Sequence, residues 1–311
     1  MSGNAKAQPF NVRFMRGLRR QWPLHLMLLP AVVVLLMFAY YPMAGIIVAF
    51  QRFNPRLGIW GSPIVGFQHF EFMLRMPETR QVIFNTVFIA CMKIVGNLVV
   101  PVFFALLLDL VRHNKFKRSV QTIIYFPFFL SWVILGGILI DILSPSTGIV
   151  GIATRAVGLE PVFWLGSPTL FPYVLVVTDV WRNFGFGTIV YLAAITSIDP
   201  GQYEAAILDG ANRFKQTIHI TLPGILPIIM LMATLALGNV LNAGFDQVLN
   251  LYNDIVRETG DILDTLVFRV GLLDNRFELG TAIGLFRSVV SLIFVTLGYY
   301  LASRFANYRV F

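Results

Sequence analysis

The chain has 311 residues, of which 57% are hydrophobic and only 13% are charged, and its mean hydropathy is +0.73. Because about a quarter of the residues in soluble domains are charged, these values exclude an ordinary soluble protein and indicate an integral membrane domain. The formal net charge of +8 arises from short Lys and Arg clusters beside apolar runs, a pattern that favours topology signals over a nucleic-acid surface.

The N-terminal segment, residues 1–23, is basic and carries apolar side chains at a helical spacing. Phe10, Phe14, Leu18 and Trp22 recur every four residues, with arginines on the remaining faces. This pattern is typical of an amphipathic helix that lies on membrane lipid. A basic anchor that only fixes topology would have the same composition.

A multi-pass membrane domain is expected over residues 24–311. Residues 21–51 lack Lys, Arg, Asp and Glu, and this run exceeds the roughly 20 residues that cross a bilayer. It is too long for the apolar core of a signal peptide. The pattern predicts an all-α fold with six transmembrane helices, at about 24–50, 83–108, 120–143, 170–196, 224–245 and 281–303.

The distribution of basic residues predicts the orientation of these spans. The two ends and the segments at 109–119 and 197–223 hold 13 of the 24 Lys and Arg residues, whereas the alternate, longer segments hold 8. Short loops rich in Lys and Arg remain in the cytoplasm. Both termini and the segment at 199–223 are therefore expected to be cytoplasmic.

The segment at 199–223 has the sequence signals of two short helices joined by a sharp turn. Asp199 is a good N-cap, and Gly210 stands where a left-handed residue would end the first helix. Asn212 is able to cap a second helix, which is expected to end before Pro223. Local propensity alone would also fit a simple hairpin that links two spans.

This segment resembles the EAA motif of the permeases of ABC importers, E-A-A-x(3)-G-x(9)-I-x-L-P. In that family the segment forms coupling helices that dock into a cleft of the ATP-binding subunit, and the resemblance implies the same here. All the fixed positions of the motif are present: Glu204, Ala205, Ala206, Gly210, Ile220, Leu222 and Pro223.

Two further stretches narrow the resemblance. "YYPMAGIIVAFQRFNPRLGIWGSPIVGFQHF" (residues 40–70) and the ending "NYRVF" are similar to maltose-type carbohydrate permeases that handle oligosaccharides or polysaccharide breakdown products. The resemblance implies a type I ABC importer permease fold in a bacterial cytoplasmic membrane. It also implies three kinds of partner: a second, related permease chain, two subunits that bind ATP and Mg, and an extracytoplasmic solute-binding protein.

Several polar side chains fall within the expected spans, where charge is costly and usually faces a cavity or a partner. They are able to line a path for a hydroxyl-rich solute, with Lys93 and Arg287 as counter-charges to an acidic one. They also fit structural roles: Asp179 and Arg182, three residues apart, would neutralise one another, and asparagines join spans. The candidate path residues are Lys93, Asp179, Trp181, Arg182, Asn183, Asn239, Asn242, Asp246 and Arg287. Gly185 and Gly187 would ease bending or close packing of the span at 170–196, and close packing is the role expected.

The sequence offers no catalytic or metal site. The only cysteine, Cys91, lies in an apolar run, the four histidines lack metal-ligand spacing, and no Gly-Lys pair exists to form a P-loop. We therefore expect no enzyme and no cofactor on this chain, but the permease subunit of an ATP-driven importer of oligosaccharides, some of them acidic. The alternatives are an importer of another solute, such as an amino acid, polyamine or phosphate, and a membrane channel or enzyme.

Overall fold

A computed structural model describes residues 21–238 and 240–305, and this described part is helical, with one isolated bridge between Gln51 and Ile64. The all-α prediction is confirmed. The expected interfacial positions Phe10, Phe14 and Leu18, and the NYRVF ending, lie outside the described residues, as does Asn239.

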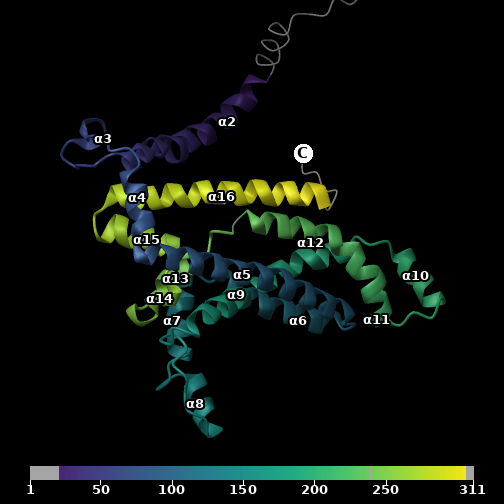
Figure 1. The fold of residues 1–311 in the computed structure, drawn as a ribbon. Helices are drawn as coiled ribbons and strands as arrows, with labels where there is room; N and C mark the ends of the chain where they lie inside the picture. Colours follow the sequence, from purple (N-terminus) through teal and green to yellow (C-terminus); the bar gives the residue numbers. More distant parts are fainter. Residues whose placement is uncertain (1–20, 239, 306–311) are drawn as a thin grey trace, which may run out of the picture.

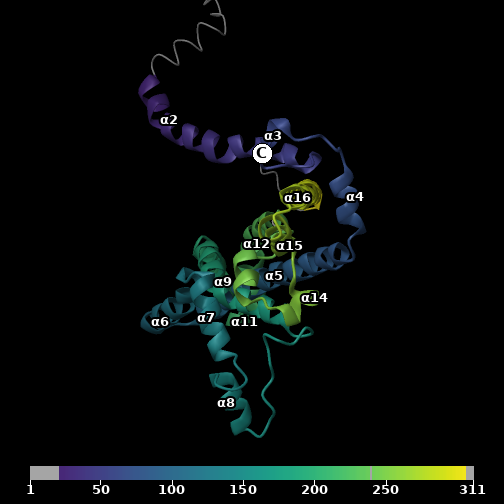
Figure 2. The ribbon, with the colours of Figure 1, turned by 90° about the vertical axis from the view of Figure 1, so that its left-hand side faces the viewer.

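The first long helix is continuous but changes its geometry twice. It consists of α2 (Trp22–Leu35), a π-helical turn (Leu36–Tyr40) and a 3-10 segment (Tyr41–Phe50). No residue of α2 is buried, and both ribbon views show α2 standing apart from the other helices (Figures 1 and 2). Only the 3-10 segment packs on another long helix, α16 (Phe277–Phe305).

The centre of the bundle is the pair α5 (Pro77–Leu110) and α9 (Phe171–Thr196), which lie alongside each other (Figure 1). Close approach is possible because small residues face large ones: a Cβ on Gly96 of α5 would lie 2.5 Å from Val180 Cγ2 of α9. Buried apolar side chains from both helices form the shared core, including Ile89, Ala105 and Leu175.

The span expected at 120–143 is sharply bent. α6 (Asn114–Tyr125) and α7 (Trp132–Ile142) meet at 106° across a 3-10 turn at Phe126–Phe129. The turn contains Pro127, which has no backbone N–H, and α7 restarts at Ser131, whose hydroxyl accepts a hydrogen bond from the N–H of Ile134.

The helix found at the span expected at 224–245 begins earlier, at Arg213, and ends earlier, at Leu237. It begins with α11 (Arg213–Gln216), passes through a π turn (Thr217–Thr221) and continues as α12 (Leu222–Leu237). The prediction that a helix ends before Pro223 is therefore wrong, because the π turn that ends at Thr221 shifts the hydrogen-bond pattern just before Pro223, which lacks a backbone N–H, and the helix continues past it. After Leu237 the chain unwinds and restarts as α13 (Phe245–Leu251).

Short helices occupy the two ends of the bundle. α10 (Pro200–Leu208) lies at one end (Figure 1). The opposite end carries most of the others: α3 (Gly58–Gly61), α4 (Gln68–Arg75), α8 (Ile149–Ala156), a 3-10 turn at Asp254–Val256, α14 (Arg257–Gly260), α15 (Leu263–Phe268) and a π turn at Arg269–Leu273.

Four helices in the described part of the chain are long and apolar enough to cross a membrane, and five if the bent α6–α7 pair counts as one span. They are Trp22–Phe50, Pro77–Leu110, Arg213–Leu237 and Phe277–Leu297. α9 is not among them, since it carries the polar residues Asp179, Arg182 and Asn183 near its middle. The sixth span thus stays a prediction.

Candidate functional site

The segment at 199–223 has the local structure that its sequence predicts. The Asp199 carboxylate accepts a hydrogen bond from the Gly201 N–H at 2.9 Å and caps α10. Gly210 has a φ of +76° and ends the helix, since only glycine adopts this conformation without strain. Asn212 then caps α11 by accepting from the Lys215 N–H at 2.9 Å.

α10 and α11 present apolar side chains to the surface. Leu208 is 89% exposed, Phe214 71% and Ile207 62%. Glu204 and Ala205 are exposed beside them, and Ala206 and Ile220 are half-buried. Leu222 and Pro223 are exposed at the start of α12. An exposed apolar patch of this kind at a charged surface marks a site of protein or lipid contact.

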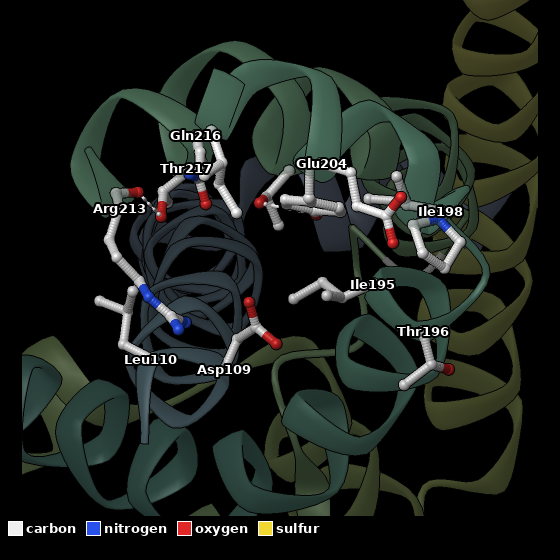
Figure 3. Close-up of a pocket in the computed structure, with 13 residues that line it drawn as sticks. Asp109, Leu110, Ile195, Thr196, Ile198, Glu204, Arg213, Gln216 and Thr217 are labelled. Carbon is white, nitrogen blue, oxygen red and sulfur yellow. Dashed lines mark hydrogen bonds between the residues drawn. The ribbon is translucent and has the colours of Figure 1, made fainter. Parts of the chain in front are cut away.

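A cavity of about 510 Å³ separates α10 from the ends of α5 and α9. Figure 3 shows Asp109 entering it from α5, Glu204 from α10 and Arg213 from α11. The hydroxyl of Tyr203 on α10 lies 2.9 Å from that of Thr221. This hydrogen bond ties α10 directly to the helix that becomes α12.

A second polar region lies in the middle of the bundle around Lys93. Its side chain is 7% exposed, and its ammonium group lies 3.5 Å from the Asp179 carboxylate. It donates to the carbonyl of Ala243 at 2.6 Å and to the side-chain oxygen of Gln247. Gln247 is fully buried and donates in turn to Thr178 and to the Leu175 carbonyl, each at 2.8 Å.

The expected neutralisation of Asp179 by Arg182 is wrong. Asp179 pairs with Lys93 and also accepts from Asn97 at 2.8 Å and from Asn183 at 3.2 Å. Arg182 instead holds the bend of the α6–α7 span: it donates to the carbonyls of Phe128 and Leu130 at 3.1 to 3.3 Å. Its guanidinium also lies over the rings of Phe128 and Trp132, at 5.6 and 5.2 Å.

A groove of about 580 Å³ lies beside this network. Asn242, Asp246 and Arg287 line it, so the structure brings three of the candidate path residues together. Asn242 lies in the unwound chain before α13, whereas Asp246 lies in the first turn of α13. The groove is completed mainly by Trp132, Phe245, Gln247, Asp264, Val267 and Phe268.

These groups suit a hydroxyl-rich solute. Amide and carboxylate side chains bond hydroxyl groups, and the aromatic rings offer flat apolar faces. Arg287, the cation that lines the groove, already has partners in the protein. It pairs with Asp264 at 2.7 Å and donates to the Leu241 carbonyl at 3.2 Å.

The family described as "Binding-protein-dependent transport system inner membrane component" matches residues 102–307, which is more than half of the chain. The chain belongs to this family of inner membrane permeases.

Its relatives include permeases named for carbohydrates. The permease is 39% identical over 299 residues to the polygalacturonan/rhamnogalacturonan transport system permease YteP of Bacillus subtilis, covering 96% of this chain and 93% of the relative. It is 36% identical over 300 residues to Protein LplB of the same organism, covering 96% and 94%.

Solved structures agree with the fold. A bacterial ABC transporter involved in the import of the acidic polysaccharide alginate contains a chain 35% identical to the permease, with a TM-score of 0.88 over 94% of this chain and 99% of that one. The same type of transporter in complex with an alginate pentasaccharide-bound periplasmic protein gives a TM-score of 0.86.

The candidate path residues of the permease thus fall into separate places. Lys93, Asp179 and Asn183 belong to the buried network, Arg182 holds the α6–α7 bend, and Trp181 is 42% exposed outside both. Sequence reasoning missed Gln247 and Asp264, the partners of Lys93 and Arg287.

Proposed function

We propose that this chain is the permease subunit of an ATP-driven importer that moves oligosaccharides across the bacterial cytoplasmic membrane by alternating access. The relatives named for rhamnogalacturonan and alginate support a saccharide solute, including acidic breakdown products of polysaccharides. The groove supports it independently, because it combines hydrogen-bonding side chains with aromatic rings.

The proposed topology has six spans with both termini in the cytoplasm. α9 is the additional span: it is 26 residues long, enough to cross the membrane, and much of its surface is buried against other helices of the chain. An interior span tolerates Asp179 and Arg182, because both side chains meet polar partners in the protein.

The proposed partners attach at the two ends of the bundle and along its side. Two ATP-binding subunits, which hold ATP and Mg, dock at the end that carries α10. A solute-binding protein delivers the saccharide at the opposite end. A second permease, related but different in sequence, completes the pathway. This chain itself holds no cofactor and performs no catalysis.

One observation carries the assignment: the segment at 199–223 contains the complete EAA sequence, and its helix α10 has an exposed apolar surface and a direct hydrogen bond to a long helix. The Tyr203–Thr221 hydrogen bond joins α10 to a helix that runs for 25 residues, Arg213–Leu237. Closure of the ATP-binding subunits would move α10, and the rigid helix would carry this displacement to the unwound segment beside the groove.

Replacement of Gly210 by valine tests this coupling. The φ of +76° is strained for a β-branched residue, so Gly210→Val should displace the turn after α10. We expect the reconstituted transporter to lose saccharide uptake, and its ATP hydrolysis to stop responding to the loaded solute-binding protein.

Gly158→Val is the matched control. Gly158 also has a positive φ, +78°, neither glycine has a neighbour within 4 Å of an added Cβ, and Gly158 follows α8 near the opposite end. If Gly210→Val keeps full uptake and stimulated hydrolysis, α10 is not the coupling element. A co-purified solute-binding protein that holds an amino acid, polyamine or phosphate would contradict the saccharide assignment.

A further inference from the structure

The chain is unwound between α12 and α13, at residues 238 and 240–244, and we call this stretch the break. It lies in the membrane domain, since Lys93, midway along α5, reaches its backbone. Gly244, with a φ of +91°, reverses the chain into α13. Carbonyl groups in such a stretch lack the helical N–H partners, and within the hydrocarbon region each must be bonded by other protein groups or by water.

The carbonyl of Ala243 receives its hydrogen bond from α5. Lys93 donates to it at 2.6 Å while it pairs with Asp179 of α9. The fit around this ammonium group is tight, because a Cβ on Gly244 would lie 2.9 Å from Lys93 Nζ. One buried cation thus links α5, α9 and the break.

The carbonyl of Leu241 receives its hydrogen bond from α16. Arg287 donates to it through Nε at 3.2 Å, and its Nη1 reaches the Asp264 carboxylate of α15 at 2.7 Å. The arrangement repeats that of Lys93: a cation from a long helix is held by a carboxylate from another element and bonds one carbonyl of the break.

Both cations act on the segment that carries part of the groove lining. Asn242 lies between the two bonded carbonyls, and Asp246 lies in the first turn of α13. We propose that Lys93 and Arg287 are positioning residues that clamp the break on both sides of Asn242 and thereby fix the groove. Neither cation serves as a counter-charge to the solute.

Two simpler roles make different predictions. If Lys93 only neutralised Asp179, the double variant Lys93→Met/Asp179→Asn would be harmless, because it removes both charges. If Arg287 were a solute contact, its loss would affect acidic saccharides and spare neutral ones. A clamp instead requires the donor itself, since the Ala243 carbonyl stays unsatisfied in the double variant.

A buried cysteine in the break measures its opening directly. Ala243 is fully buried, and an Ala243→Cys variant in a Cys91→Ser background keeps the Ala243 carbonyl. We expect maleimide labelling at position 243 of the complete transporter to accelerate about ten-fold or more in Lys93→Met/Asp179→Asn and in Arg287→Met/Asp264→Asn, because a lost charged hydrogen bond favours local opening.

The exposed ion pair Arg75–Glu71, with side chains 82% and 69% exposed, provides the matched control. Arg75→Met/Glu71→Gln should leave labelling at position 243 at the parent rate. Parent rates in both clamp variants would overturn the inference.

Loss of the whole fold is distinguished by a second buried cysteine. Ala105 lies fully buried in the core between α5 and α9, and Ala105→Cys should stay slow to label in every variant. Fast labelling of a double variant at both positions 243 and 105 would mean that the whole fold has opened. In that case the milder variant Arg287→Lys provides the test of the clamp. Lysine keeps a positive charge beside Asp264 but lacks the Nε that donates to the Leu241 carbonyl. Fast labelling of this variant at position 243 alone supports the clamp. Parent rates at both sites, or fast labelling at both, overturn it.

Uptake gives a second readout, and this one rests on the proposed function. We expect the KM for neutral and for acidic saccharides to rise to a similar degree in Arg287→Lys, because the groove itself loses its shape. An increase confined to acidic saccharides would overturn the clamp in favour of direct contact. A parent transporter that takes up no saccharide would contradict the proposed function and leave the labelling result intact.

Discussion

At the scale of single residues, the core of this permease depends on backbone contacts that leave no room for a side chain. A Cβ on Gly185 would lie 2.1 Å from the Ile124 carbonyl oxygen of α6, and one on Gly187 would lie 2.9 Å from Pro101 of α5. The close-packing role expected for these two glycines is confirmed. They allow α9 to approach two neighbours at once.

Gly185→Ala should therefore destabilise the protein. The added methyl group meets main-chain atoms that cannot rotate away, and overpacking of this kind costs about 1 to 3 kcal/mol. We expect a lower midpoint in thermal unfolding of the purified transporter in detergent. Gly137→Ala is the control, since its Cβ would have no neighbour within 4 Å on α7. Equal midpoints for the two variants would refute the packing argument.

At the scale of elements, two places of irregular backbone are bonded by three cations. Arg182 bonds the carbonyls at the α6–α7 bend, Lys93 and Arg287 bond those of the break. Bends and breaks leave carbonyl groups without helical partners, and buried or half-buried cations on neighbouring helices supply the missing donors.

Arg182→Lys should loosen the α6–α7 bend. An ammonium group cannot reproduce the planar fork that bonds two carbonyls and stacks on Trp132. The loss of hydrogen bonds to a charged donor predicts a destabilisation of about 1.5 to 3 kcal/mol. Thermal unfolding measures it, and Arg155→Lys is the control, because Arg155 bonds an exposed carbonyl, that of Ser146. An unchanged midpoint in Arg182→Lys would show that the bend does not depend on the guanidinium.

The elements that the sequence predicts well are those whose signals are local. The caps at Asp199 and Asn212 and the turn at Gly210 use side chains and backbone within three residues of one another. The break was not predicted, because no proline or charged residue marks a boundary between Leu237 and Phe245, and the glycines and asparagines of this stretch also occur within membrane helices. The partners of Lys93 and Arg287 were missed for a different reason, since Gln247 and Asp264 are distant from them in sequence.

At the scale of the whole molecule, the two ends of the bundle have different surfaces. One end carries α10 with Leu208, which is 89% exposed. The other carries α3, where Trp60 is 90% exposed, together with α4 and α14. The proposed topology places the first of these ends in the cytoplasm and the second outside.

Cysteine labelling tests that topology. In a Cys91→Ser background, a membrane-impermeant maleimide added to intact cells should label Trp60→Cys and leave Leu208→Cys unmodified. Inside-out vesicles should give the opposite pattern, and the ATP-binding subunit should protect position 208. Labelling of Leu208→Cys from outside the cell would reverse the orientation and exclude docking at α10.

The isolation of α2 affects how this protein responds to its lipid. No side chain of α2 is buried, so among the described residues α2 is held only through the 3-10 segment that follows it, and its tilt also follows from interfacial anchors such as Trp22, which is 62% exposed. The tightly packed pair of α5 and α9 cannot tilt in the same independent way. A thicker or thinner bilayer would therefore change the angle between α2 and the rest of the molecule, while the groove keeps its form.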